Sequence, residues 1–128
     1  MTTLSQAKII GFIPSTDLEA SLAFFKDTLG LLLTREDEYA LEFDISGAKL
    51  RITKVAEFTP ANYTILGWEI PDIESAVTAL MKKGVHFEKF AGLPQNELCI
   101  CSFPGGSKVA WLKDPDGNTL SLTQFTPL

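Results

Sequence analysis

Two related stretches of sequence decide the fold: Asp17-Leu18-Glu19-Ala20-Ser21 and, fifty-five residues further on, Asp72-Ile73-Glu74-Ser75-Ala76. A repeat at a fixed offset indicates that the chain is built from two similar modules. After each aspartate, apolar residues recur at spacings of four and then three, which places them on one face of a helix. These apolar residues are Leu18, Leu22 and Phe25 in the first copy and Ile73, Val77 and Leu80 in the second.

Both predicted helices have suitable residues at their ends. Asp72, and either Thr16 or Asp17 in the first copy, can accept hydrogen bonds from the free amide groups of the first turn. Gly30 and Gly84 follow the helices, at the place where a left-handed residue commonly ends a helix. Each copy therefore predicts one amphipathic helix with its own start and end.

Short runs rich in β-branched and aromatic residues surround both helices and predict strands. Before the helices they cover 8–13 and 64–70. We expect Pro14 and Pro71 to end these strands, because proline donates no hydrogen bond to a β-ladder. The runs that follow the helices cover 31–34, 39–45 and 48–54 in the first copy and 86–90, 107–112 and 119–123 in the second.

Turns and loops separate these strands. Ser46-Gly47 and residues 114–118 consist of residue types that favour tight turns. Within the irregular segment 91–106, the apolar stretch 98–101 fits either a short strand or a buried loop. Each half therefore consists of a strand, a helix and three more strands. The predicted fold class is α+β, with tandem βαβββ modules at about 8–54 and 63–124 in a single domain over 1–128.

The composition is that of an ordinary globular domain, with 128 residues, 45% hydrophobic and 21% charged. Eleven Lys and Arg against sixteen Asp and Glu give a net charge of −5, which argues against a nucleic-acid partner. No apolar run approaches the roughly 20 residues of a membrane span, and the first residues lack the features of a signal peptide. With only two cysteines, we expect a cytoplasmic protein without a membrane partner.

A longer pattern links the chain to a known family. Residues 17–25 are followed by Leu29-Gly30, residues 72–74 have Gly84-Val85 after them, and Trp111-Leu112-Lys113-Asp114-Pro115-Asp116-Gly117-Asn118-Thr119-Leu120 is the most specific stretch. Together with the tandem βαβββ pattern, these stretches resemble the vicinal oxygen chelate superfamily. That superfamily contains glyoxalases, extradiol dioxygenases, fosfomycin-resistance thiol transferases and bleomycin-resistance proteins.

The resemblance implies a curled mixed sheet around a cleft, with helices outside and a divalent metal or an organic ligand inside. In the family's enzymes, the first and last strands of each module supply the metal ligands. Here these positions hold Ile10, Ile65, Arg51 or Thr53, and Ser121. Aliphatic side chains have no lone pairs, and a neutral hydroxyl alone is a poor ligand. The chain thus resembles a short member without the usual metal ligands, so we expect no cofactor. The alternative is one divalent metal ion at an atypical site.

Strand alternation predicts which side chains line the cleft. If Leu50 and Ile52 face the helices, the residues beside them face the cleft. Applied to the central strands, this rule gives an apolar floor with aromatic walls and a few polar groups: Ile10, Phe12, Arg51, Thr53, Ile65, Gly67, Glu69, Trp111, Ser121 and Thr123. The direction of Trp111 is ambiguous. Such a mixture suits a small organic ligand, although Arg51 and Glu69 alternatively form only a solvated pair at the rim.

Three other groups have functional and plain interpretations. His86, the single histidine, is either a general base or an ordinary residue at the start of an edge strand, which we favour. Cys99 and Cys101 lie on one side of a strand if 98–101 is extended, where they hold a soft metal or, more simply, fill the core. Asp114 and Asp116 lack the spacing of a calcium loop, so we expect a structural turn.

These observations predict a metal-independent small-molecule-binding protein of the glyoxalase/bleomycin-resistance type, either resistance-like or metabolite-binding. A homodimer is expected, because copies of this fold often complete their clefts by symmetry. The alternative is a metal-dependent lyase, isomerase or dioxygenase with an atypical site, for which no catalytic residue is identified. A third possibility is a subunit whose cleft is filled by Phe12 and Trp111.

Overall fold

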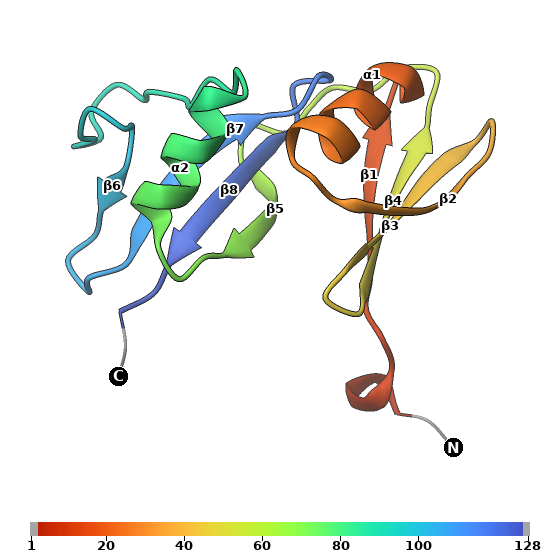
Figure 1. Ribbon diagram of the computed structural model, residues 1–128, viewed down its shortest axis with the longest axis horizontal. Coiled ribbons are helices and arrows are strands. Elements are labelled where there is room, and N and C mark those ends of the chain that lie inside the picture. The colour runs from red at the N-terminus through yellow and green to blue at the C-terminus, as the bar shows by residue number, and fades with distance from the viewer. Residues whose placement is uncertain (1–2, 127–128) are drawn as a thin grey trace. The chain divides into compact units, whose positions relative to one another are not determined.

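The computed structural model describes residues 3–126 and separates into two compact units, with the boundary between Thr59 and Pro60 (Figure 1). Each unit holds one four-stranded sheet, in the order β1-β4-β3-β2 in the first unit and β5-β8-β7-β6 in the second. In both units the first strand runs parallel to the last, and the other pairs are antiparallel. The predicted α+β class with tandem βαβββ modules is confirmed. Met1 and Thr2, which belong to the first residues compared above with a signal peptide, lie outside the described residues.

The first unit contains the strands predicted for it, with small shifts at their ends. They are β1 (Ile10–Ser15), β2 (Leu32–Glu36), β3 (Ala40–Ile45) and β4 (Ala48–Lys54), after a short 3-10 turn η1 (Leu4–Gln6). The two-residue turn between β3 and β4 is also confirmed, since Ser46 and Gly47 have φ values of 50° and 90°. Two successive left-handed residues match the twist of a β-hairpin.

The expected end of the first strand at Pro14 is wrong. Strand β1 continues through Pro14 to Ser15, and Pro14 lies opposite Thr53 of β4. β1 is an edge strand with β4 as its sheet neighbour. A proline is tolerated at an edge, because its missing N–H is not needed on the free side.

The first helix has an irregular second half. Helix α1 (Leu18–Leu22) begins at Asp17, whose carboxylate accepts a hydrogen bond from the Ala20 amide at 3.1 Å. The helix continues as a π-helix, η2 (Ala23–Thr28), closed by a bond from the Leu29 amide to the Phe24 carbonyl at 2.9 Å. A π-turn takes one more residue than an α-turn, so a periodicity of 3.6 does not reveal it.

The helix and sheet of the first unit enclose an apolar core. The Phe25 ring is fully buried and lies 6.2 Å from the Phe43 ring of β3. Leu50 and Ile52 of β4 are also buried on this face, and Ile13 of β1 joins them. Alternate residues of each strand therefore face the helix, as the sequence pattern predicts.

The second unit repeats this plan. Its elements are β5 (Thr64–Glu69), α2 (Ile73–Lys82), β6 (Cys101–Ser102), β7 (Lys108–Lys113) and β8 (Thr119–Gln124). Asp72 caps α2 through the Ser75 amide at 3.2 Å, and Gly84 follows the helix with φ 93°. Both predicted caps and the predicted end of β5 before Pro71 are confirmed. Ile73 and Val77 of α2 are fully buried.

The outer edge of the second sheet differs from the prediction. Residues 86–90 do not form a strand, and among them only Phe87 makes a bridge, with Leu112. The edge strand of this sheet is β6, which has only two residues. In the stretch 98–101, residues 98–100 therefore form a loop, and Cys101 begins the strand.

The side chain of Gln95 explains this difference. Its amide nitrogen donates to the carbonyls of Glu88 and Cys99, both at 2.8 Å, and its oxygen accepts from the Phe90 amide at 2.8 Å. Backbone groups that a strand would use in a ladder are thus satisfied by one side chain. Asn96 supports the same loop by accepting from the amides of Leu98 and Ile100.

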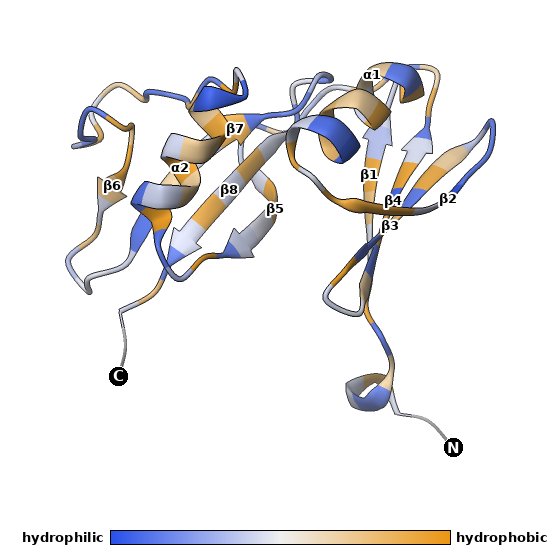
Figure 2. Ribbon diagram, in the orientation of Figure 1, coloured by the Kyte–Doolittle hydropathy of each residue, from blue (hydrophilic) through white to orange (hydrophobic). Residues whose placement is uncertain are grey.

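Hydropathy alternates along the strands of each unit, so that every sheet has an apolar and a mixed face (Figure 2). The apolar face packs beneath α1 or α2, which leaves the opposite face without a helix (Figure 1). Within residues 3–126, no helix has the length and apolar character needed to cross a membrane.

Candidate functional site

The predicted cleft residues lie on the face of each sheet that is opposite its helix, here called the open face. In the first unit, Phe12 is next to the buried Ile13, and Arg51 lies between the buried Leu50 and Ile52. Ile10 and Phe12 are 44% and 65% exposed, which is unusual for large apolar side chains in a sheet. The structure places Ile10 opposite Lys49, Phe12 opposite Arg51, and Thr53 opposite Pro14 and Ala40.

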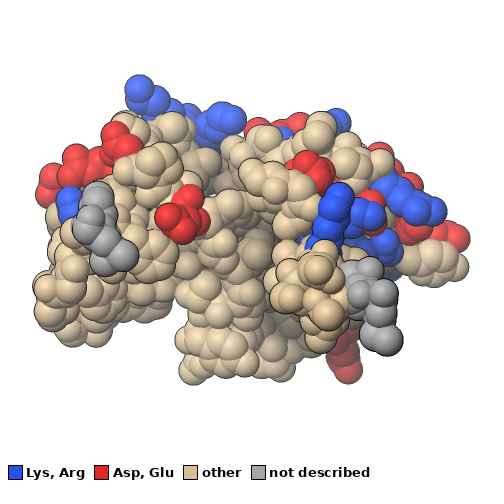
Figure 3. All heavy atoms as spheres, turned by 90° about the horizontal axis from the view of Figure 1, so that it is seen from below, with Lys and Arg blue, Asp and Glu red and all other residues tan. Residues whose placement is uncertain are grey.

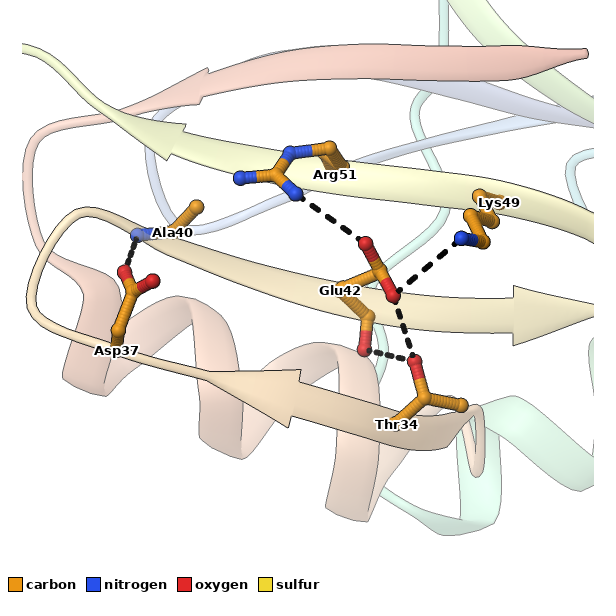
Figure 4. A network of polar contacts seen from close by, with 6 residues as sticks. All are labelled: Thr34, Asp37, Ala40, Glu42, Lys49 and Arg51. Carbon is orange, nitrogen blue, oxygen red and sulfur yellow. Dashed lines mark hydrogen bonds and ion pairs between the residues drawn. The ribbon is translucent and has the colours of Figure 1, made fainter.

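Glu42 organises the charges of the first open face (Figure 4). The Arg51 guanidinium lies 3.2 Å from one Glu42 carboxylate oxygen, and the Lys49 ammonium lies 3.9 Å from the other. Thr34 donates its hydroxyl to the Glu42 carbonyl at 3.1 Å and to its carboxylate at 3.3 Å. The Glu42 side chain is 12% exposed, so this ion pair is better shielded than a typical surface pair. Arg51 therefore pairs with a residue of its own sheet.

The same hairpin contains a second ordered carboxylate. Asp37 accepts hydrogen bonds from the Tyr39 amide at 2.8 Å and the Ala40 amide at 3.0 Å. These bonds lower the pKa of the Asp37 carboxyl, because they stabilise its ionised form. Asp37 thus fixes the turn between β2 and β3 from outside the open face (Figure 4).

In the second unit, Gly67, Ser121 and Trp111 form one row across the open face. A Cβ atom added at Gly67 would lie 2.8 Å from the Ser121 hydroxyl oxygen, so only glycine fits here without a shift. Ala110 and Leu112 are fully buried on the helix side, which turns Trp111 toward the open face and removes its ambiguity.

An aromatic pair and a neighbouring row complete this face. The Phe90 ring stands edge-on to the Trp111 ring, with centroids 5.4 Å apart and planes at 85°. This geometry is favourable for two aromatic rings. Glu69 lies opposite Thr123 in the next row, and Ile65, 37% exposed, lies at an irregularity of the strand pairing.

A surface hollow of about 210 Å³ lies beside the last two rows of β5 and β8. We call it the Glu69 hollow; it is lined by Gly67, Trp68, Glu69, Thr123 and Phe125. The hollow thus brings together three predicted site residues, Gly67, Glu69 and Thr123. Phe125, which was not predicted, also lines it. Glu69 makes no ion pair within the described part of the second unit, residues 60–126.

The residues at the family's metal-ligand positions do not fit a divalent ion. Ile10 and Ile65 have no donor atom, and Arg51 carries a positive charge that already pairs with Glu42. Ser121 offers a single neutral hydroxyl. The residue is only 6% exposed, and its hydroxyl lies next to Gly67. Across residues 3–126, the structure contains no group of three or more His, Cys, Asp or Glu placed to hold a metal ion.

The histidine and the cysteines lie elsewhere in the second unit. His86 and Cys99 line a separate hollow of about 320 Å³ after the end of α2. His86 is not at the start of an edge strand, so that prediction is wrong. Cys99 lies in the loop with φ 63°, which agrees with the buried-loop alternative for this part of 98–101. Cys101 lies in β6, and both thiols are free and buried, at 8% and 1% exposed.

The turn predicted at 114–118 is confirmed and is held by the Asp114 carboxylate. Its oxygens accept from the Asp116 and Asn118 amides at 2.9 Å and from the Asn118 side chain at 2.8 Å. Burial nevertheless raises the pKa of the Asp114 carboxyl, because desolvation outweighs these hydrogen bonds. Gly117 has φ 89°, as a residue in this turn requires.

The predicted site residues do not include Glu42 and Lys49 of the first open face, nor Phe90 and Phe125 of the second unit. Glu42 alternates with the buried Leu41 and Phe43, so the alternation rule was sufficient to find it. Phe125 follows the predicted strand 119–123, and Phe90 belongs to a loop, so no local period identifies them.

The two open faces differ in charge. On the first, the Glu42 carboxylate pairs with Arg51 and Lys49. On the second, Lys113, two residues after Trp111 on β7, lies 3.9 Å from Glu88, and Glu69 makes no ion pair within residues 60–126. Figure 3 shows Lys and Arg side chains next to Asp and Glu side chains at the right of the view.

Comparison with known proteins identifies the class. The family model of the glyoxalase/bleomycin resistance protein/dioxygenase superfamily matches residues 8–122, and the chain belongs to this superfamily. A search of curated proteins found no significant match.

Solved structures share the fold. A protein from Bacillus anthracis described as a member of the glyoxalase family is 16% identical, with TM-score 0.75, covering 98% of this chain and 100% of that one. A bleomycin resistance determinant encoded on the transposon Tn5 is 18% identical, with TM-score 0.73, covering 94% and 99%. A lactoylglutathione lyase from Agrobacterium tumefaciens is 19% identical, with TM-score 0.72, covering 95% and 96%. At these identities the likeness concerns the fold.

Proposed function

We propose that this protein is a metal-independent small-molecule-binding protein of the glyoxalase/bleomycin-resistance type. The observation that carries the proposal is the chemistry of the metal-ligand positions, where Ile10, Ile65 and Ser121 replace the residues that a metal requires. The family scaffold is present while its usual Lewis-acid site is not supported. Binding is the function that such a scaffold retains.

The open faces supply what an organic ligand needs. Exposed apolar side chains such as Phe12 and Ile10 offer area that is removed from water on binding. Arg51, held by Glu42, and Glu69 in its hollow offer polar groups in defined positions. Defined polar groups within an apolar surface give a ligand its orientation.

The first experiment measures the metal content of the purified, untagged protein by mass spectrometry. The melting temperature is then recorded with added Mn²⁺, Ni²⁺, Zn²⁺ and Fe²⁺. A ligand at a hundred times its dissociation constant stabilises a protein by about 2.7 kcal/mol, which is several degrees for a domain of this size. We expect substoichiometric metal and no shift, followed by stabilisation by members of an organic compound library.

One tightly bound metal per chain would contradict this proposal. It would favour the alternative, a metal-dependent lyase, isomerase or dioxygenase with an atypical site. A protein that gains stability from neither metals nor any organic compound would favour a subunit whose open faces contact protein.

We also propose that the protein is a homodimer in the cytoplasm. Large apolar side chains on an exposed sheet face are common where two copies meet. Sedimentation equilibrium of the full chain checks this, with a mass of twice 14.0 kDa expected.

A further inference from the structure

We propose that the Glu69 hollow binds the protonated amine of a small organic ligand. This inference rests on the proposed function, because it names the ligand class of that binding protein. The hollow contains one carboxylate, and none of its lining residues is basic. Glu69 is exposed and, within residues 60–126, makes no ion pair that would compete with a ligand cation.

Two neighbours of Glu69 add contacts that a cation uses. The Phe125 ring is 57% exposed and lines the same hollow, and an aromatic face attracts a cation within about 6 Å. The Thr123 hydroxyl can accept a hydrogen bond from an ammonium N–H. Carboxylate, ring and hydroxyl together favour an ammonium group over a neutral or anionic one.

The size of the hollow limits what enters it. Its volume of about 210 Å³ lies below the roughly 300 Å³ at which pockets for whole drug-sized molecules begin. It therefore suits an ammonium group and its adjacent carbons, while the rest of the ligand lies on the open face beside Gly67.

Gly67 keeps the Glu69 hollow accessible from the open face. The corresponding position of the first unit, fifty-five residues earlier, is Phe12, whose side chain stands out from the sheet. In the second unit the absence of a side chain leaves the approach from the open face to Glu69 free, and the close contact with Ser121 prevents a larger residue from fitting without a shift. The two units thus differ at the position that decides access.

The test uses three probes of similar size and different charge: benzylamine, benzyl alcohol and benzoate. Binding to the full chain is followed by ¹H–¹⁵N NMR at about pH 7. We expect benzylamine to shift the amides of residues 67–69 and 123–125, benzyl alcohol to bind about tenfold more weakly, and benzoate to cause no shift there. Glu69→Gln is expected to weaken benzylamine binding about tenfold, and Phe125→Leu to weaken it several-fold.

Glu97→Gln is the matched control, since Glu97 is an exposed carboxylate of the same unit outside the hollow. It should leave benzylamine binding unchanged, and the NMR spectra of all variants should show the native fold. Equal binding of benzylamine and benzyl alcohol, or equal binding in Glu69→Gln, would overturn the assignment of an amine. If neutral library compounds still bind the open face in that case, the proposed function stands and this inference fails. If a metal binds tightly and no organic compound does, the proposed function fails as well.

Discussion

The two units share a scaffold and differ in the middle row of the open face. The row is Phe12, Arg51 and Glu42 in the first unit and Gly67, Ser121 and Trp111 in the second. Strand pairing places these residues at corresponding positions. One row is therefore charged and internally paired, and the other is small, polar and bounded by an aromatic ring.

The comparison shows that the helix-facing side of the sheet is similar in the two units, whereas the open side differs. The helix-facing side needs apolar side chains in both units, because the core depends on their burial. The open side has no such requirement, so its residues can differ between the two units. In the first unit Glu42 pairs with Arg51 and Lys49, whereas Glu69 of the second unit makes no ion pair within residues 60–126.

The largest effect is expected where the units are alike, on the buried side. Phe43→Ala should destabilise the protein by about 3–5 kcal/mol, and Leu112→Ala by about 2–5 kcal/mol, because each leaves a cavity in its core. Urea unfolding measures both. The control is Phe12→Ala on the open face, with an expected change within about 0.5 kcal/mol. A loss as large as that of Phe43→Ala would show that Phe12 belongs to the core.

The second prediction concerns the glycine that distinguishes the rows. Gly67→Ala should destabilise the protein by about 1–3 kcal/mol, because its Cβ would stand 2.8 Å from the Ser121 oxygen. Gly11→Ala in β1 is the matched control, since a Cβ there meets its nearest atom at an ordinary 3.6 Å. Thermal unfolding compares the two variants. Equal melting temperatures would mean that Ser121 moves aside without cost.

The third prediction compares the two carboxylates. Glu42→Gln should cost about 1 kcal/mol, because it removes the charge that pairs with Arg51 and Lys49. Glu69→Gln should change stability by less than about 0.5 kcal/mol. Urea unfolding at low and high salt checks this, since salt should shrink the loss in Glu42→Gln. A larger loss in Glu69→Gln would mean that Glu69 has a structural partner.

The smallest effect concerns the cap of α2. The Ser75 hydroxyl, 2.8 Å from the Asp72 carboxylate, is the main cause that lowers the pKa of Asp72 below 3.8, followed by the Ser75 amide. The ionised Asp72 therefore stabilises the fold above pH 3.8, and this contribution is lost as the pH falls through the lowered pKa. Ser75→Ala should move the pKa of Asp72 upward, toward 3.8, in an NMR titration. An unchanged pKa would assign the effect to the amide alone.

Much of the fold could be predicted because its signals are local. Asp17 and Asp72 mark helix starts by their own hydrogen-bonding capacity, and alternation separates the two faces of β4 within seven residues. The Ser46-Gly47 turn also fixes the pairing of β3 with β4, so that Glu42 opposite Arg51 follows from the turn. The sequence therefore held enough information to predict the ion pair between Glu42 and Arg51.

Other features depend on contacts between distant residues. The strand predicted at 86–90 fails because Gln95 takes its backbone groups, and no period in the sequence announces a side chain in that role. Phe125 lines the Glu69 hollow and directly follows β8, which ends one residue beyond its predicted end. Such contacts are decided by tertiary structure and not by local propensity.

The loop held by the hydrogen bonds of Gln95 is also relevant to aggregation at high protein concentration. A long free strand at the side of a sheet is a template on which other chains pair and aggregate. Here the outer side of β7 is closed by the two residues of β6 and the bridge at Phe87, and β2 carries a bulge with the charged Arg35 and Glu36. Gln95 holds the loop that covers the first of these sides, and in this way it limits the length of free strand at that side of the sheet.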